Sequence, residues 1–284
     1  MPGLSAVDIK KHLPNIVNTA LGHLDATRKN ILSTKIKVPN EKDSTPPALW
    51  MTMHECTGRV HSDLTGAMPI VGYNKAKYII IFYCEDTNYI HIETATSRKG
   101  PELLKVLKSA IAFLTNCHIT TTTLRLDNEC SQTMKDYVHH AGIKLELTPA
   151  SQHRRNKSER AIRTAKNHII STHAGVDPNC PANLWPRYNA QIELTLNLLR
   201  AAPSGTSSWE AMHGAYDFNA CPLAPIGIKV VAHVPSLERA TWAQHGLIGY
   251  YVGPAPDHYR CFQVWIENTK AIRISDCVES QRKY

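Results

Sequence analysis

The chain has 284 residues, enough for one large core domain with a smaller unit beside it. Its 32 Lys and Arg against 24 Asp and Glu give a net charge of +8 and a pI near 9.0, which favours a polyanionic partner such as nucleic acid. The sequence has neither the apolar run of about 18 residues that a membrane-spanning helix needs nor a signal peptide, so we expect an intracellular protein.

The first fifty residues carry two short helical patterns and then a linker rich in Pro and charge, KVPNEKDSTPPALW. His12 and His23 could be two ligands of a zinc site, or they could be histidines near the surface. No two of the eight Cys form a Cys-x-x-Cys pair, which favours the second interpretation. We expect free thiols rather than disulfides, most of them buried as small core residues.

The next part of the chain predicts a mixed α/β sheet. Three consecutive strand patterns, 60–71, 77–86 and 89–96, indicate an antiparallel meander. Further elements follow as an amphipathic helix at 100–118, a strand at 121–128, a helix at 131–142, a strand at 143–150, a helix from Lys157 and another across 182–201. Five strands with helices between them favour an α/β fold in which helices flank a five-stranded sheet.

The C-terminal part has a different texture. After a short helix at 207–214, β patterns recur about every ten residues at 228–235, 246–253, 259–267 and 271–278, which predicts a small antiparallel, barrel-like module. Its aromatic residues, Trp242, Tyr250, Tyr251, Tyr259, Phe262 and Trp265, could stack on DNA bases or fill the core of the barrel. Electrostatic binding of a DNA backbone fits this module better than base readout.

Three acids occupy positions from which they could share metal ions. Asp63 lies in the first strand, Asp127 at the end of the fourth, and Glu159 at the start of a helix. If the first and fourth strands are neighbours, Asp63 and Asp127 project toward the same edge, and a helix across that edge can add Glu159. Three such carboxylates require divalent metal, and two Mg²⁺ would suit phosphodiester chemistry.

Basic residues surround the third acid. Arg163 and Lys166 lie four and seven residues after Glu159, on the same helix face, where phosphates beside metal-bound carboxylates would meet them. The predicted DNA-binding residues are Arg154, Arg155, Lys157, Arg160, Arg163 and Lys166. The alternative is a weak surface ion pair between Glu159 and Arg163.

The segments around these acids resemble a known family. HSDLTGAMP, LRLDNECS and TPASQHRRNKSERAIRTAKNHII are similar, in this order, to the three acidic motifs of a retroelement integrase catalytic core, nearest to the copia type of retrotransposon within the retroviral integrase superfamily. Residues 22–35, 184–214 and 246–280 also resemble the segments that flank such a core. The resemblance divides the chain into residues 1–50, an N-terminal segment whose zinc module is degenerate or absent, 51–203, the catalytic core, and 204–284, the C-terminal module.

The resemblance implies a ribonuclease-H-like fold with Asp63, Asp127 and Glu159 as catalytic metal ligands. It further implies Mg²⁺, or Mn²⁺ in its place, and an enzyme that processes DNA 3′ ends and transfers the strand. The implied partners are the element ends, target DNA and further copies of the chain, in the nucleus on chromosomal DNA or in the cytoplasm.

Two features depart from the family pattern. Only 31 residues separate Asp127 from Glu159, a few fewer than is usual, and the Cys pair of the N-terminal zinc module is missing. A decayed or domesticated integrase that binds DNA without turnover therefore stays open, as does a ribonuclease-H-type nuclease that hydrolyses without transfer. Among other acids, Glu93 is expected on the solvated face of its strand and Glu129 in solvent at a strand end, and His139 and His140 are expected to be exposed.

Overall fold

The computed structural model describes residues 21, 56–127, 130–148 and 157–280. The predicted N-terminal helices, His12, His23 and Glu129 lie outside the described residues. The elements are β1 (Arg59–Leu64), β2 (Tyr78–Cys84), β3 (Tyr89–Ala95), α3 (Gly100–Asn116), β4 (Thr123–Asp127), α4 (Gln132–His140), β5 (Lys144–Thr148), α5 (Lys157–Ala174), η2 (Ala182–Leu184), α6 (Trp185–Leu199), α7 (Ser208–His213), β6 (Lys229–His233), η3 (Ser236–Glu238), β7 (Gly246–Pro254), β8 (Phe262–Ile266), β9 (Ala271–Ser275) and β10 (Val278–Ser280).

The first sheet has the strand order β3-β2-β1-β4-β5. Strands β1, β2 and β3 form the predicted antiparallel meander, whereas β4 pairs with β1 and β5 pairs with β4 in parallel. This is the five-stranded, ribonuclease-H-like mixed sheet that was expected, with β1 at its centre. The first predicted strand, 60–71, is shorter than expected: β1 ends at Leu64, and the residues after it form a loop.

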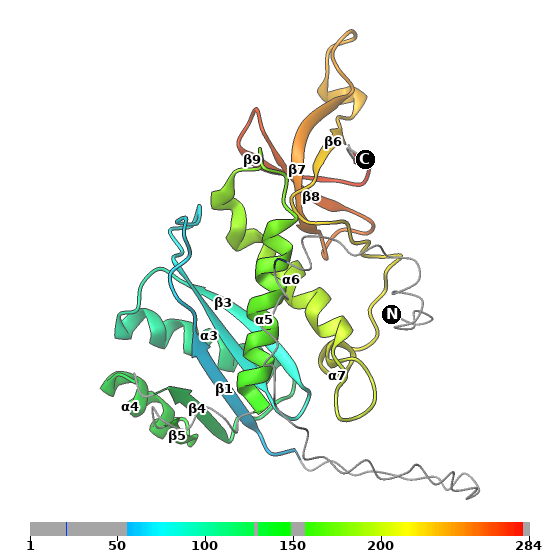
Figure 1. Ribbon diagram of the computed structural model, residues 1–284. Coiled ribbons are helices and arrows are strands. Elements are labelled where there is room, and N and C mark those ends of the chain that lie inside the picture. Colours follow the sequence, from blue (N-terminus) through cyan, green and yellow to red (C-terminus); the bar gives the residue numbers. More distant parts are fainter. Residues whose placement is uncertain (1–20, 22–55, 128–129, 149–156, 281–284) are drawn as a thin grey trace, which may run out of the picture.

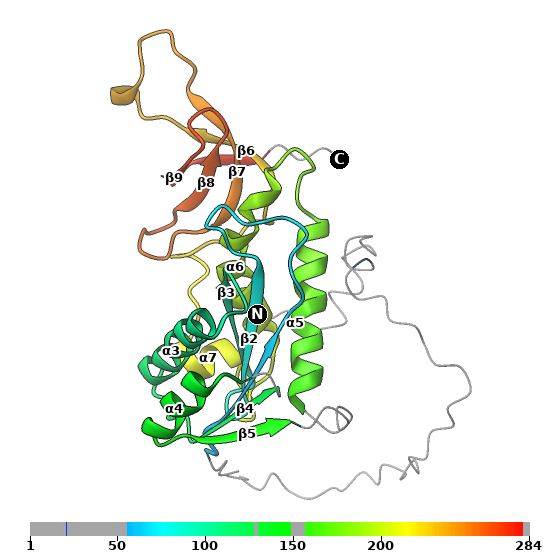
Figure 2. The ribbon, with the colours of Figure 1, turned by 90° about the vertical axis from the view of Figure 1, so that its left-hand side faces the viewer.

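Helices cover both faces of this sheet (Figures 1 and 2). Side chains alternate along the apolar strand β2: Ile80 and Phe82 pack in the cluster beneath α3 and α4, whereas Ile79 and Ile81 pack in the cluster beneath α5 and α6. A strand buried on both faces reads as a continuous apolar run, which is why β2 showed no alternation in the sequence. None of the described helices is long and apolar enough to cross a membrane.

Helix α6 covers the free edge of the sheet at β3. Asn197 accepts a hydrogen bond from the backbone N–H of Ile90 (2.9 Å) and donates one to its carbonyl (2.7 Å), while Glu193 accepts from the N–H of Ile92 (2.8 Å). Residues four apart lie on one helix face, so two side chains of α6 satisfy backbone groups that an edge strand leaves unpaired.

The second sheet is antiparallel, in the order β10-β6-β7-β8-β9. The predicted strand at 271–278 is in fact two strands, because the chain turns after Ser275 and β10 crosses to the far edge to pair with β6. The return of the last strand to the first matches the expected barrel-like arrangement, although no pairing between β9 and β10 closes the sheet within the described residues.

This second sheet packs on the first through β7 and α6 (Figure 1). Tyr250 and Val252 belong to the same core cluster as Tyr188 and Ile192 of α6. Tyr251 points to the other face, where it packs with its own module and donates a hydrogen bond to Oε1 of Gln191 (2.7 Å). The C-terminal sheet therefore shares one apolar core with the part of the chain that carries the acids.

Candidate active site

Asp63 lies in the central strand β1, on the sheet face that α5 covers. Val60 and Leu64 pack in the cluster beneath α3, so the alternate residues His61 and Asp63 lie on the opposite face. The Asp63 carboxylate is half-buried, and its Oδ2 accepts a hydrogen bond of 2.8 Å from Nζ of Lys166 in α5. The ammonium group of Lys166 thus pairs with the first predicted metal ligand.

Asp127 is the last residue of β4, the parallel neighbour of β1. The register pairs His61 with Arg125, and Asp63 and Asp127 each lie two residues further along their strands. Parallel strands end at the same edge of a sheet, so the backbone brings these two positions to one edge, as predicted for neighbouring first and fourth strands. The Asp127 side chain lies outside the described part of the structure.

Glu159 lies in the first turn of α5 and is exposed. The helix is held to the sheet by Ala161, Ala165 and Ile169, all buried. Among described residues, Glu159 has no ion pair with Arg163, so the alternative of a surface pair is not what the structure contains. An anionic side chain at a helix N-terminus is favourable with respect to the helix dipole.

The carboxylates fit a hard divalent cation in their donor chemistry. Asp63 pairs with the ammonium group of Lys166 through one oxygen, so it is available as an ionic ligand. Carboxylate oxygens are the ligands that Mg²⁺ and Mn²⁺ prefer. Among side chains that the structure describes, no three His, Cys, Asp or Glu form a metal-binding group. The Asp127 side chain lies outside the described residues, so the convergence of Asp63, Asp127 and Glu159 stays a prediction.

The predicted DNA-binding residues fall into three groups. Arg154 and Arg155, and the side chain of Lys157, lie outside the described part. Arg160 and Arg163 are exposed and form no ion pair with another described residue. Lys166 is the exception, because its ammonium group is engaged by Asp63.

A row of polar and charged residues, which sequence reasoning missed, crosses the same sheet face next to Asp63. His61 is 3% exposed, and its Nε2 lies 2.6 Å from Oε1 of Glu85. Burial lowers the pKa of His61, although Glu85 opposes this effect. Beside it, Arg125 donates to Oε2 of Glu146 at 2.8 Å. The signal was the period of two that His61 and Asp63 share on β1.

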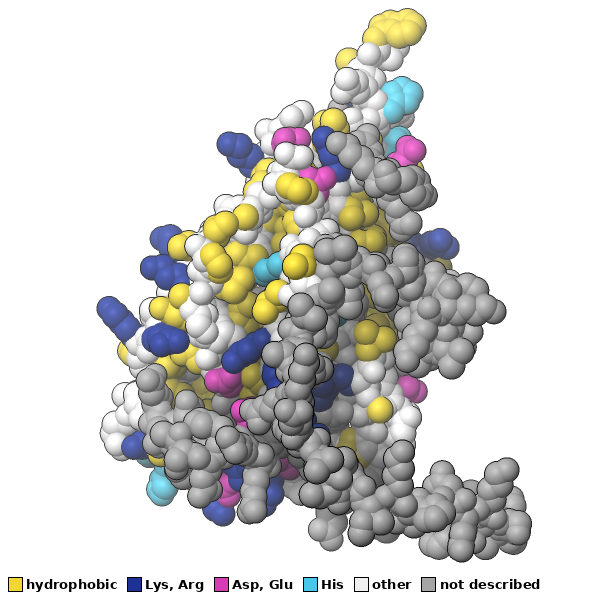
Figure 3. Space-filling view, viewed as in Figure 1, with side chains coloured by type: hydrophobic (Ala, Val, Ile, Leu, Met, Phe, Trp, Pro, Cys, Tyr) yellow, Lys and Arg dark blue, Asp and Glu magenta, His cyan; other side chains and the backbone are white. Residues whose placement is uncertain are grey.

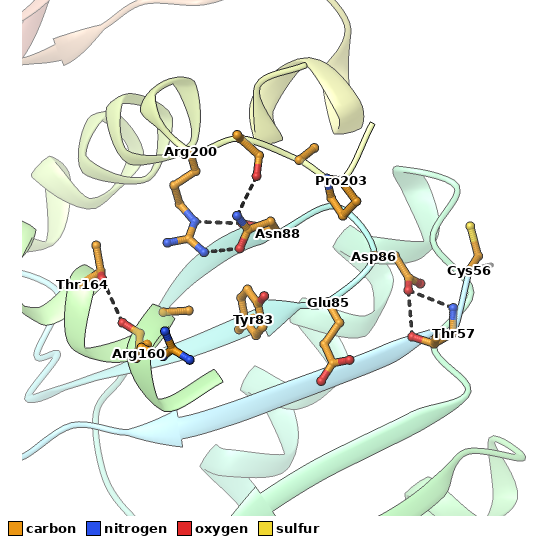
Figure 4. A pocket seen from close by; sticks show the side chains of 13 residues that line it. Cys56, Thr57, Tyr83, Glu85, Asp86, Asn88, Arg160, Thr164, Arg200 and Pro203 are labelled. Atoms are coloured by element: carbon orange, nitrogen blue, oxygen red, sulfur yellow. Dashed lines mark hydrogen bonds between the residues drawn. The ribbon is translucent and has the colours of Figure 1, made fainter. Parts of the chain in front are cut away.

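A cleft of about 620 Å³, lined by both charged and apolar residues, lies beside the first turn of α5, near the end of β2 and the segment after α6 (Figure 4). Arg160 and Arg200 both line it. Arg200 donates to the backbone carbonyl of Asn88 (2.9 Å), and the two acids of the cleft are also engaged, Glu85 by His61 and Asp86 by the Thr57 N–H (2.8 Å). Arg160 forms no ion pair with a described residue, so its guanidinium group is available to an incoming anion.

Other candidates from the sequence fall away from this site. Glu93 was expected to be solvated, which is wrong: it is half-buried on the α3 face, where it accepts hydrogen bonds from Ser109 (2.8 Å) and bonds His91 (3.3 Å). That face is opposite to Asp63, so Glu93 is not a ligand beside it. His139 and His140 are exposed, as predicted.

The predicted free thiols are present, but most are not buried. Cys84 and Cys180 are buried, whereas the other six are partly or fully exposed.

The aromatic residues of the C-terminal module divide between the two alternatives of core packing and base stacking. Tyr250 and Tyr251 are core residues, and Trp242 and Tyr259 are exposed. Figure 3 shows hydrophobic side chains at the tip of the upper projection, and Lys and Arg side chains along the margin and lower end of the core.

No family model and no curated protein matches the sequence. Among solved structures, the chain is similar to the catalytic core domain of BIV integrase, with 16% identity, 55% of this chain and 93% of that chain covered, and a TM-score of 0.39. It is also similar to the HTLV-2 integrase catalytic core domain in complex with magnesium, in its trimeric form (19% identity, 55% and 95% covered, TM-score 0.41). A simian T-cell lymphotropic virus intasome in complex with the PP2A regulatory subunit B56 gamma covers more of the chain (12% identity, 82% and 84% covered, TM-score 0.40). At these identities and TM-scores the likeness by itself carries no conclusion about activity.

Proposed function

We propose that this protein is an integrase-like polynucleotidyl transferase that processes DNA 3′ ends and transfers the strand into target DNA, and that it is of the copia type. The observation that carries the proposal is the parallel pairing of β1 with β4. This pairing brings the backbone positions of Asp63 and Asp127 to the same edge of the sheet. Helix α5, which carries Glu159, contacts the central strand β1 through the pair between Lys166 and Asp63.

In this proposal Asp63, Asp127 and Glu159 hold Mg²⁺, or Mn²⁺ in its place. Bound there, a metal pair would activate an attacking oxygen and stabilise a leaving oxygen of a phosphodiester. The chain's own task is to fix the carboxylates. Strands β1 and β4 fix the first two through the ladder, and the buried face of α5 fixes the third.

The exposed cations of α5 bind the DNA backbone in this proposal. Arg160 at the cleft, Arg163 and Lys166 would contact phosphates, together with Arg154, Arg155 and Lys157 before them. We further propose that the protein acts as a homo-oligomer on element ends and target DNA, within the cell, either in the nucleus on chromosomal DNA or in the cytoplasm.

Replacing one proposed ligand tests the assignment. Asp127→Asn keeps the size of the side chain but removes its charge, so we expect Mg²⁺-dependent strand transfer to fall at least about a hundredfold, while DNA binding and the unfolding midpoint change little. Joining of an oligonucleotide with a pre-processed 3′-hydroxyl end, followed on a gel, measures transfer. Asp257→Asn, an exposed acid in the turn between β7 and β8, is the matched control. Transfer by Asp127→Asn at the level of the control would overturn the assignment.

A second candidate is a DNA-binding protein that no longer turns over. The observation that favours it is the neutralisation of Asp63 by Lys166, which a non-catalytic protein could keep permanently. This candidate predicts salt-sensitive DNA binding with no joined and no cleaved product at any Mg²⁺ or Mn²⁺ concentration. The same gel assay separates it from the transferase, and cleavage without joining would indicate a nuclease.

A further inference from the structure

The contact between Lys166 and Asp63 joins the two halves of the proposed site. Nζ of Lys166 and Oδ2 of Asp63 are 2.8 Å apart, the distance of a charge-assisted hydrogen bond. One residue is a proposed metal ligand and the other a proposed phosphate contact. The ammonium group on Oδ2 repels a divalent ion bound by the same carboxylate and takes up part of its negative charge, so the two roles compete.

The surroundings allow the lysine to leave while the helix stays. Ala165 and Ile169, on either side of Lys166 in α5, are buried, so the backbone of this turn is fixed against the sheet. The side chain itself is 40% exposed and that of Asp63 33% exposed, which leaves the ammonium group a path into solvent. A lysine has a flexible four-carbon stem, so its charge can move several ångströms without any change in the helix.

The neighbouring arginine on the same face behaves differently. Arg163 lies one turn before Lys166, is exposed, and has no ion pair with a described residue. It is therefore available to a phosphate whether or not a metal ion is bound. Among the described cations of α5, only Lys166 pairs with a proposed ligand.

We propose that Lys166 is the counter-ion of Asp63 in the metal-free protein. When a divalent cation binds at Asp63, the ammonium group of Lys166 moves away and pairs with a DNA phosphate instead. This inference rests on the proposed function, since it takes Asp63 as a metal ligand. It makes metal binding and DNA binding mutually reinforcing, because each state that frees Asp63 also frees Lys166. By linkage the coupling must be equal in both directions.

The expected coupling is modest. The side chain of Lys166 is 40% exposed and that of Asp63 is 33% exposed. Ion pairs with this exposure are weak because water and salt screen them. Removing the lysine charge should therefore tighten metal binding by about twofold to fivefold rather than by orders of magnitude. A weak pair suits a contact that must break in every cycle of binding.

The first experiment measures Mn²⁺ binding to the full chain without DNA, by electron paramagnetic resonance of the free ion. Lys166→Gln should bind Mn²⁺ about twofold to fivefold more tightly than the wild type, whereas Arg163→Gln, which removes the same charge from the same face, should change the affinity less. Lys166→Arg keeps the charge and should not show the increase. It also guards against an effect of the glutamine on folding, which thermal unfolding checks independently.

The second experiment measures DNA affinity by fluorescence anisotropy with a short labelled duplex, with and without Ca²⁺ as a cation that does not support turnover. The wild type should gain affinity when Ca²⁺ is present. Lys166→Gln should lose most of that gain, while Arg163→Gln should weaken binding by the same factor in both conditions.

The outcomes separate this inference from the proposed function. If Asp63→Asn binds Mn²⁺ as tightly as wild type and as the control Asp257→Asn, Asp63 is no metal ligand and both proposals fail. If Asp63→Asn loses Mn²⁺ but Lys166→Gln matches Arg163→Gln in both experiments, the proposed function stands and the role of Lys166 is overturned.

Discussion

His91 and Glu193 form an ion pair that is almost completely buried between β3 and α6. Nδ1 of His91 lies 3.0 Å from Oε1 of Glu193, and the histidine ring stacks on Phe113 with centroids 4.1 Å apart. Burial alone would lower the pKa of His91, but the carboxylates of Glu193 and Glu93 outweigh it and raise the pKa to about 9. His91 is therefore charged at neutral pH and serves stability, on the sheet side away from Asp63.

Removing the charge of Glu193 should destabilise the protein strongly. Glu193→Gln leaves His91 without its main counter-ion, and breaking one partner of a buried pair costs about 3 kcal/mol of unfolding free energy. Denaturant unfolding at pH 7 measures this cost. Glu238→Gln, which breaks the exposed pair with Arg273, is the control and should cost less than about 1 kcal/mol. Equal effects of the two variants would contradict the role of the buried pair.

The same pair predicts a pH dependence. Because the pKa of His91 is higher in the folded state than its unfolded value of about 6.5, its contribution to stability is complete below pH 6.5 and is lost as pH rises through about 9. The unfolding free energy of the wild type should therefore fall between about pH 7 and 10. In Glu193→Gln this decrease should be much smaller, and an unchanged slope would show that another group titrates.

At the scale of elements, the side chains of α6 take the place of a sixth strand along β3. Asn197 pairs both backbone groups of Ile90, and it is fully buried. A sequence pattern does not reveal this, because Asn and Glu in an apolar helix predict a solvated stripe. The helix was predicted from its apolar positions, whereas the burial of its polar residues follows from its place at a sheet edge.

Shortening Asn197 should expose the cost of that edge. Asn197→Ala leaves the N–H and C=O of Ile90 unsatisfied, so we expect a loss of about 2–4 kcal/mol of unfolding free energy and faster hydrogen exchange at the Ile90 amide. Asn167→Ala, on the partly exposed side of α5 and without a described hydrogen bond, should change stability by less than about 0.5 kcal/mol. A loss below about 1 kcal/mol for Asn197→Ala would mean that water replaces its hydrogen bonds.

At the scale of the whole molecule, charge is distributed unevenly. Residues 227–280, the C-terminal sheet, contain five Lys or Arg and five Asp or Glu, so their formal charges cancel. The excess of basic residues lies elsewhere, with Arg160, Arg163 and Lys166 on one exposed helix face. Electrostatic binding of the DNA backbone, which we expected of the C-terminal module, is thus better supported for the core.

This distribution predicts which variants change the salt dependence of DNA binding. The double variant Arg160→Gln and Arg163→Gln should reduce the slope of log affinity against log salt by about two, since each phosphate contact contributes about 0.9. Arg260→Gln, in the turn between β7 and β8 of the C-terminal module, should leave the slope unchanged. Anisotropy titrations at several salt concentrations measure the slopes, and the reverse result would assign DNA binding to the module.

The sequence by itself determined the elements and their order. Apolar periodicity, turn residues and the position of each acid predicted every strand of the first sheet and α3 to α6, because these signals are local. Their ends were less well predicted, as at β1, which stops at Leu64, and at residues 271–278, which form two strands.

Only the tertiary structure decided which residues meet. Parallel pairing of β1 with β4, the edge of β3 closed by Asn197, the charged His91 beneath α3 and the binding of Asp63 by Lys166 all join residues far apart in the chain. Such contacts depend on packing, burial and side-chain direction, for which a single sequence carries no periodic signal. The sequence could therefore predict Asp63 as a ligand, a prediction that stays open, but it could not predict the Lys166 ammonium group that pairs with Asp63.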